Sequence, residues 1–201
     1  VDPSSVMGAT KRLAEMLVLQ QPEESSTVFT AVRFGNVLRS RGSVVPIFEH
    51  QIEQGGPVTV THPDMTRYFM SVSEAVRLII QAGTFTEGGE LFMLDMGEPI
   101  SIDQLARRLI RLRGLRPDVD IDVAYVGMRP GEKLTERLYG EDERSVPTTH
   151  PSVYRVESAH TGLKASAVDD LLEMHRSADS AALVRQLQFL TNAHLTPAQD
   201  T

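Results

Sequence analysis

The stretch "PSSVMGATKRLAEMLVLQQ" (residues 3–21), which leads into "SSTVFTAVRFG" (25–35), decides the fold class. In the first segment a serine precedes apolar residues at helical spacing, and Val6, Leu13 and Leu17 share one face, which predicts a helix to about residue 21. The second segment is β-branched and bounded by polar residues, which predicts a buried strand. A helix followed at once by a buried strand is typical of an α/β protein.

Helical and extended patterns continue to alternate along the chain, which supports the α/β class. Ser73 and Ser101 are the expected N-caps of two helices, and Gly114 is the expected C-terminal stop of the second. From Glu141 onward the pattern weakens. The expected helices are 44–55, 71–83, 101–113, 131–140 and a pair within 164–190, and the expected strands are 57–61, 89–97, 120–127 and 152–157.

Composition excludes several classes of function. The 201 residues carry a net charge of −7, which argues against non-specific nucleic-acid binding through Lys and Arg. The chain has no Cys and therefore no disulfide or thiolate metal site, and its six His show no metal-binding spacing. No apolar run approaches the roughly 20 residues that a membrane helix needs. The arginines between 107 and 116 scatter around a helix and indicate a solvated face.

Met7 and Lys11 stand four residues apart on the first predicted helix, so both side chains can face one site. A lysine beside a nicotinamide ribose can hydrogen-bond the ribose and lower the pKa of a nearby acid. Methionine has no proton to exchange, so Met7 cannot be an acid or a base. The alternative is an ordinary amphipathic helix with a core methionine and a solvated lysine.

The segment "RFGNVLRSRGSVV" (33–45) follows a predicted strand, and α/β sheets bind ligands at the carboxyl ends of their strands. Asn36 can donate and accept hydrogen bonds, and the backbone N–H groups of residues 42–44 can cradle phosphate oxygens. The alternative is a Gly/Ser loop that opens a helix.

Three further residues have side chains suited to a nucleotide. Arg67 can grip a pyrophosphate in bidentate fashion, or it can lie over its own aromatic neighbours. Arg129 can pair with a phosphate, and Glu132 can accept both ribose hydroxyls. Glu132 can equally be a first-turn residue of the helix expected over 131–140, favoured by the helix dipole.

Four runs, in order, resemble the nucleotide-sugar 4,6-dehydratases of the extended short-chain dehydrogenase/reductase superfamily: "DPSSVMGATKRLAE" (2–15), "RFGNVLRSRGSVVPIF" (33–48), "TRYFMSVSEA" (66–75) and "GMRPGEKLTERL" (127–138). The resemblance is to the bacterial capsule and O-antigen polysaccharide branch, whose long, membrane-anchored members have Met-x-x-x-Lys where Tyr-x-x-x-Lys is usual. It implies the C-terminal part of a Rossmann-like parallel sheet plus a small α/β substrate-binding lobe over 1–140, and a mostly helical C-terminal extension over 141–201.

The resemblance also implies residue roles. Lys11 would be catalytic, with Met7 in place of the usual tyrosine, and Lys11, Arg33 and Phe34 would face the nicotinamide of NAD or NADP. An upstream Thr or Asp, acting directly or through water, is our hypothesis for the proton acceptor that replaces the tyrosine. The residues implied to contact a UDP-sugar are Asn36, Arg41, Gly42, Ser43, Val44, Arg67, Arg129 and Glu132.

The implied activity is that of a UDP-N-acetylglucosamine 4,6-dehydratase, with this chain as its substrate-binding fragment and inactive alone. The family's Asp-Lys pair would lie just before Val1, and the expected strand–GxGxxG–helix motif is not in the chain. The parent protein would work on the cytoplasmic side of an inner membrane, and a homo-oligomer is left open. The alternatives are a nucleotide-sugar 4-epimerase or reductase and a non-catalytic sugar-nucleotide sensor.

Overall fold

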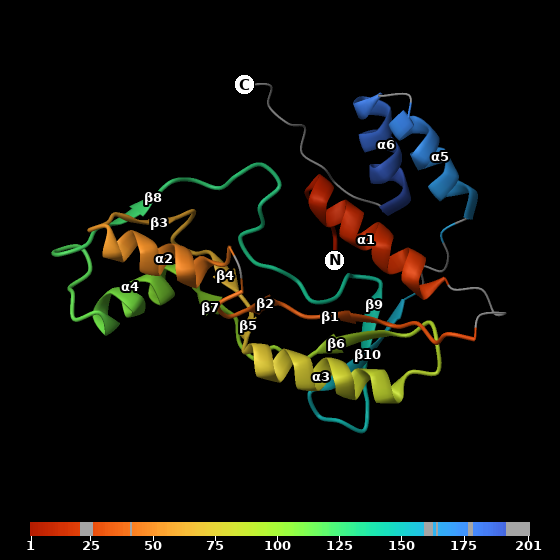
Figure 1. Ribbon diagram of the computed structural model, residues 1–201, viewed down its shortest axis with the longest axis horizontal. Coiled ribbons are helices and arrows are strands. Elements are labelled where there is room, and N and C mark those ends of the chain that lie inside the picture. The colour runs from red at the N-terminus through yellow and green to blue at the C-terminus, as the bar shows by residue number, and fades with distance from the viewer. Residues whose placement is uncertain (21–25, 41, 159–162, 164, 177–178, 192–201) are drawn as a thin grey trace. The chain divides into compact units, whose positions relative to one another are not determined.

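In the computed structural model the chain folds into two compact units, whose helices and strands are labelled in Figure 1. Unit 1 comprises Val1–Arg33, Ile79–Leu94 and Arg137–Thr201, and unit 2 comprises Phe34–Leu78 and Asp95–Glu136. Strands and helices alternate within this division, as the α/β class predicted. The described residues are all those of the chain except 21–25, 41, 159–162, 164, 177–178 and 192–201.

Unit 1 is built on a four-stranded sheet in the order β1-β6-β10-β9. β1 (Ala31–Arg33) and β6 (Leu91–Leu94) are parallel, whereas β10 (Val153–Ser158) is antiparallel to both β6 and β9 (Glu143–Pro147). All four residues of β6 are buried, which explains the apolar run without alternation at this point of the sequence. The strands predicted within 89–97 and 152–157 are confirmed, and β9 was not predicted. The segment 25–35 does contain a strand, β1, but its three residues are half-buried, so the prediction of a buried strand there is wrong.

The helix that carries Met7 and Lys11 is α1 (Val6–Leu19). The Ser5 hydroxyl accepts a hydrogen bond from the Gly8 N–H at 3.1 Å, so the helix begins as the sequence predicted. Ala9 is fully buried, and it packs with Leu13 against Leu187 of α6. The predicted pair of C-terminal helices is confirmed as α5 (Ala165–Arg176) and α6 (Ser180–Thr191).

Unit 2 has its own apolar core. α2 (Val44–Glu53) and α4 (Ile102–Leu112) pack on the parallel strands β3 (Val58–Val60) and β8 (Val123–Tyr125). The core side chains come from these elements and from the turns beside them. The most deeply buried are Phe48, Val58, Val60, Ala106 and Ile110.

Two short strand pairs complete unit 2. β2 (Asn36–Val37) runs parallel to β5 (Phe69–Met70), and β4 (Thr66–Arg67) runs antiparallel to β7 (Ile100–Ser101). α3 (Val72–Phe85) belongs to unit 2 up to Leu78 and to unit 1 from Ile79. None of the described helices is both long enough and apolar enough to span a bilayer.

The prediction of a helix over 131–140 is wrong. The described backbone there forms turns: Gly131 has a φ of +77°, and the carbonyl of Leu134 accepts the N–H of Thr66 at 3.0 Å. That carbonyl therefore pairs with β4 and is not available to a helix. The helical pattern of "GEKLTERLYG" was overridden by this long-range backbone pairing.

One predicted cap is displaced by two residues. α3 begins at Val72, so its cap is Ser71 and not Ser73. The Ser71 hydroxyl accepts the Glu74 N–H at 3.2 Å, and the Glu74 carboxylate accepts the Ser71 N–H at 3.4 Å, which is a capping box. The predicted cap Ser101 is confirmed, because its hydroxyl accepts the Gln104 N–H.

Candidate functional site

The candidate site in unit 2 centres on Arg67, the second residue of β4. Its side chain is only 12% exposed. The Nη1 group donates to two backbone carbonyls, that of Thr66 at 2.7 Å and that of Leu134 at 3.1 Å. These two bonds orient the guanidinium and leave its other edge, Nε and Nη2, for a ligand.

Two carboxylates face this free edge without hydrogen-bonding to it. Nη2 lies 3.9 Å from an oxygen of Glu132, and Nε lies 4.0 Å from an oxygen of Glu136. Both distances exceed those of an N–H···O hydrogen bond. The edge of Arg67 that suits bidentate phosphate binding is therefore balanced by charge but not filled.

The segment 129–136 supplies one wall of this site. Glu132 and Arg129 form a reciprocal turn, since the Glu132 carboxylate accepts the Arg129 N–H at 3.0 Å and the Glu132 N–H donates to the Arg129 carbonyl at 3.0 Å. Glu132 is thus held by its own loop and not by a helix dipole. Arg129 is exposed, and its guanidinium has no ion-pair partner among the described residues. Its charge is free to meet an anion.

Asn36 lies close to Arg67 through strand pairing. Its N–H donates to the carbonyl of Tyr68 at 2.9 Å, and its Cα is registered with that of Phe69, two residues beyond Arg67. Asn36 is exposed, so its amide can meet a ligand. The approach of the two strands requires Gly35, because a Cβ there would lie 2.8 Å from the Tyr68 Cβ.

The start of α2 offers donors to an anion. Ser43 is its N-cap, and its hydroxyl is the one buried side-chain polar atom of the described residues that lacks a hydrogen-bond partner. The N–H groups of Val44 and Val45 open the helix, and Gly42 precedes them with a φ of +74°. Orphan N–H groups at a helix N-terminus favour phosphate. Arg41 lies outside the described residues.

Met7 and Lys11 lie on α1, in unit 1, and both are exposed on its surface, Met7 by 66%. The Lys11 ammonium has no ion-pair partner among the described residues, and its three donors suit the hydroxyls of a ribose. The alternative of a core methionine does not hold for Met7. The predicted cofactor residue Phe34 is 39% exposed at the start of unit 2.

Arg33, the other predicted cofactor residue, is held by acids of unit 1. Its guanidinium bonds Glu15 of α1 at 2.6 and 2.7 Å and Glu143 of β9 at 2.6 and 2.9 Å. Arg12 pairs with both of these glutamates as well. This set of two arginines and two glutamates, the Arg33 cluster, ties α1 to the sheet. A role of Arg33 at a cofactor stays a prediction.

The cluster shifts the titration of its acids. Burial raises the pKa of Glu15, but the hydrogen bonds and the charge of Arg33 outweigh burial, and the pKa lies below its ordinary value. Glu143 behaves in the same way: burial opposes ionisation, whereas Arg33 and the Gly140 N–H at 2.7 Å favour it, so its pKa is lowered. Both glutamates are ionised at neutral pH.

Sequence reasoning missed Glu15, Glu136 and Glu143. The i,i+3 pair of Arg12 and Glu15 was readable on the helix. Glu136 lies within the motif at 127–138, but the helix predicted over 131–140 gave no reason to expect its contact with Arg67. Glu143 pairs with a residue 110 positions away, and no local signal announces such a contact.

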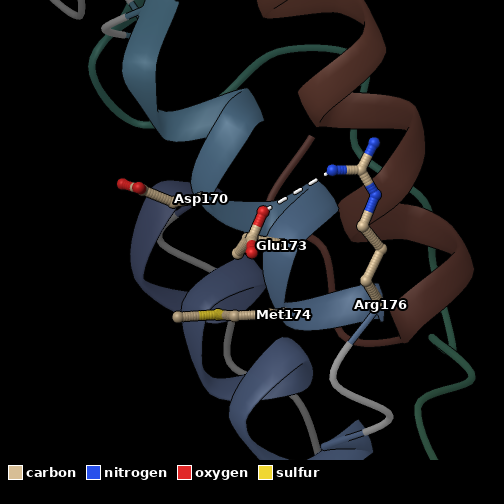
Figure 2. Close-up of a pocket in the computed structure, with 4 residues that line it drawn as sticks. All are labelled: Asp170, Glu173, Met174 and Arg176. Carbon is tan, nitrogen blue, oxygen red and sulfur yellow. Dashed lines mark ion pairs between the residues drawn. The ribbon is translucent and has the colours of Figure 1, made fainter.

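A hollow on the surface of α5 does not add chemistry. It is lined by Asp170, Glu173, Met174 and Arg176 (Figure 2). Glu173 and Arg176 form an ion pair at 3.6 Å, and both side chains are at least 75% exposed, so solvent screens the pair. Asp169 and Asp170 are exposed, as predicted for a solvated face. No cluster of potential metal ligands occurs among the described residues.

The comparisons with known proteins agree with this arrangement. The family model described as "Polysaccharide biosynthesis protein" matches residues 1–158, and the chain belongs to this family. The match runs through β9 and β10 and ends before α5. It therefore covers both the α1 helix and the Arg67 site.

Several curated relatives are similar in sequence. The chain is 55% identical to the capsular polysaccharide biosynthesis protein CapD of Staphylococcus aureus, over 80% of this chain and 27% of that protein. It is 53% identical to the probable polysaccharide biosynthesis protein EpsC of Bacillus subtilis, over 77% and 26% respectively. It is 33% identical to the UDP-glucose 4-epimerase of Rickettsia typhi, over 78% and 45%. The chain thus spans about a quarter of the length of the first two relatives.

Solved structures show the same fold. The structure of Pen from Bacillus thuringiensis matches 77% of this chain and 48% of its own, with a TM-score of 0.68 and 37% identity. DesIV, a dTDP-glucose 4,6-dehydratase from Streptomyces venezuelae, matches 70% and 44% with a TM-score of 0.60 and 17% identity. The chain therefore has the Rossmann-like α/β fold of the dehydratases and epimerases of the short-chain dehydrogenase/reductase superfamily, as predicted.

Proposed function

We propose that this chain is the substrate-binding portion of a UDP-N-acetylglucosamine 4,6-dehydratase that serves surface polysaccharide biosynthesis. One observation carries the proposal: the residues expected to hold a UDP-sugar, apart from the undescribed Arg41, all lie in unit 2, and one of them, Arg67, has a bidentate edge that makes no hydrogen bond. The family membership and the relative CapD support the polysaccharide role.

In the proposal, different residues of unit 2 would contact different parts of the UDP-sugar. Arg67 would grip the pyrophosphate with Nε and Nη2, and Arg129 would add a second positive charge. Glu132, already fixed by the Arg129 N–H, would accept the ribose hydroxyls. Asn36 and the start of α2 would meet the sugar and its phosphate, with the Ser43 hydroxyl as an unused hydrogen-bonding group.

The proposed reaction oxidises C4 of the sugar, removes the C6 hydroxyl as water and reduces C6, giving a UDP-4-keto-6-deoxy-N-acetylhexosamine. NAD or NADP would supply the hydride acceptance and return. Lys11 would hold the cofactor ribose and stabilise negative charge near C4, since its ammonium is exposed on α1. Met7 cannot exchange a proton, so an acid and a base from outside this chain would complete the site.

A second candidate is a UDP-sugar 4-epimerase, which a 33% identical relative of that name favours. It would use the same grip on UDP but no base at C5. The predicted division at residue 140 stays a prediction. The strands β9 and β10, which follow it, pair in the sheet of β6. Cytoplasmic location of the reaction, on a membrane-anchored parent, is part of the proposal.

Proton NMR tests the reaction. The full-length protein that contains this sequence is incubated with UDP-N-acetylglucosamine and NAD+, and this chain is run in parallel. The proposal expects a new C6 methyl doublet with the full-length protein and none with the chain. An epimerised product without the doublet would favour the second candidate.

A variant tests the hypothesis that the proton acceptor lies outside this chain. If it does, Met7→Tyr in the full-length protein should not sharply raise turnover.

A further inference from the structure

Arg67 is surrounded by an excess of negative charge. One guanidinium faces the carboxylates of Glu132 and Glu136, at 3.9 and 4.0 Å. The guanidinium also donates hydrogen bonds to two neutral groups, the carbonyls of Thr66 and Leu134. A diphosphate that approaches this edge meets two like charges beside the one that attracts it.

The two carboxylates are not equally free to move. Glu132 is 24% exposed and is tied to the Arg129 N–H at 3.0 Å. Glu136 is 45% exposed, and among the described residues the loose contact with Arg67 Nε is its one ion pair. Glu136 can therefore turn toward solvent at little cost, whereas Glu132 cannot.

Glu136 places a negative charge near the Arg67 guanidinium but does not orient it. The guanidinium is already oriented by the two bonds of Nη1, and the 4.0 Å separation from Glu136 is too long for a hydrogen bond. Loss of the Glu136 charge would leave the position of Arg67 unchanged. We propose that Glu136 is a displaceable counter-ion that faces the bidentate edge of Arg67 in the absence of ligand and opposes the approach of the diphosphate to it.

This inference rests on the proposed function, and it makes Glu136 a residue that sets the affinity of the site. A resting counter-ion keeps the buried arginine neutralised until a ligand with more negative charge displaces it. Because the pair is partly exposed, we expect its removal to change affinity by about two- to fivefold, and not by orders of magnitude.

The experiment is a calorimetric titration of the chain with UDP. Glu136→Gln removes the charge and keeps the shape, and Glu98→Gln is the matched control, since Glu98 is an exposed acid of the same unit with no ion pair among the described residues. We expect Glu136→Gln to bind UDP about two- to fivefold more tightly than the wild type and Glu98→Gln to match the wild type. The gain should shrink as salt rises from about 0.02 M to about 0.5 M, because ions screen the repulsion.

The outcomes separate the inference from the function on which it rests. A wild-type chain that fails to bind UDP overturns the proposed function. A wild type that binds UDP, with Glu136→Gln equal to it or weaker, overturns the counter-ion role alone. Thermal melting of each variant accompanies the titration, and we expect the melting temperature of Glu136→Gln to match that of the wild type, which ties any change in affinity to the lost charge.

Discussion

Arg33 in unit 1 and Arg67 in unit 2 have the same exposure, 12% of the side chain, but opposite surroundings. Arg33 makes four hydrogen bonds of 2.6 to 2.9 Å to two carboxylates, which use both edges of its guanidinium. Arg67 bonds two carbonyls through Nη1 alone, and its remaining edge faces carboxylates at 3.9 and 4.0 Å. Arg33 has both edges hydrogen-bonded, whereas Arg67 retains one edge without a hydrogen bond.

The comparison shows that burial alone does not distinguish a structural arginine from a binding one. A buried arginine whose two edges are both hydrogen-bonded to carboxylates holds elements together, here α1, β1 and β9. A buried arginine with an unfilled bidentate edge is suited to an anion that offers two oxygens side by side, such as phosphate. The hydrogen bonds that each guanidinium makes are therefore the basis for the proposed difference in role.

The largest expected effect is the loss of the Arg33 cluster. Arg33→Met should lower the free energy of unfolding by about 3 kcal/mol, because it leaves Glu15 and Glu143 buried with only Arg12 as a partner. Urea denaturation followed by circular dichroism measures it. The control is Arg155→Met, which removes an ion pair of the same sheet that is 49% and 40% exposed and should cost under about 1 kcal/mol. Equal losses in the two variants would contradict the distinction.

The second effect concerns binding and not folding. Arg67→Gln should weaken UDP binding by about 2 kcal/mol, roughly thirtyfold, because it removes charge-assisted hydrogen bonds to phosphate. Titration calorimetry measures the affinity. Arg111→Gln, on an exposed position of α4 in the same unit, should leave it unchanged. If Arg33→Met weakened UDP binding as much as Arg67→Gln, the contrast between the two arginines would be lost.

A third test concerns the stability that depends on the tight approach of β2 to β5. Gly35→Ala would place a Cβ 2.8 Å from the Tyr68 Cβ and 3.0 Å from the Tyr68 carbonyl oxygen, so we expect a loss of about 1 to 2 kcal/mol. Gly83→Ala meets nothing within 4 Å on α3 and should stabilise by up to about 1 kcal/mol through helix propensity. Thermal melting of both variants compares them, and a neutral Gly35→Ala would show that the strands can separate.

The smallest effect is the pH dependence of the Arg33 cluster. The pKa values of Glu15 and Glu143 lie below their ordinary value of 4.5 in the folded chain, so their stabilisation is present above pH 4.5 and is lost as the pH falls through the lowered values. Urea denaturation between about pH 3 and pH 6 measures it. Glu143→Gln should flatten this dependence, and an unchanged slope would mean that the cluster does not control it.

Several features of the fold and the site were predictable, and the reasons are local. The starts of α1 and α4 follow from Ser5 and Ser101, whose hydroxyls bond N–H groups three residues later. The apolar run within 89–97 predicted a strand, and the structure shows that all four residues of β6 are buried. Arg67 and Glu132 were singled out by their chemistry, and the structure brings them within 3.9 Å.

Other features were not predictable. β9 carries charged and polar residues, and it forms a strand because β10 pairs with it over five residues. The helix expected over 131–140 was lost to the pairing of Leu134 with Thr66, 68 residues earlier in the chain. In both cases the deciding partner is distant in sequence, and local periodicity contains no information about it.

The sequence by itself determined the α/β class, the main helices and the family resemblance, because caps, periodicity and motif spacing act over a few residues. It also singled out the residue types of the proposed UDP site. Only the tertiary structure decided which arginine has both edges hydrogen-bonded and which keeps one edge open. That choice depends on Glu143, 110 residues from Arg33, and on Leu134, 67 residues from Arg67. Hydrogen-bond satisfaction is a property of groups that meet in space, and folding alone brings them together.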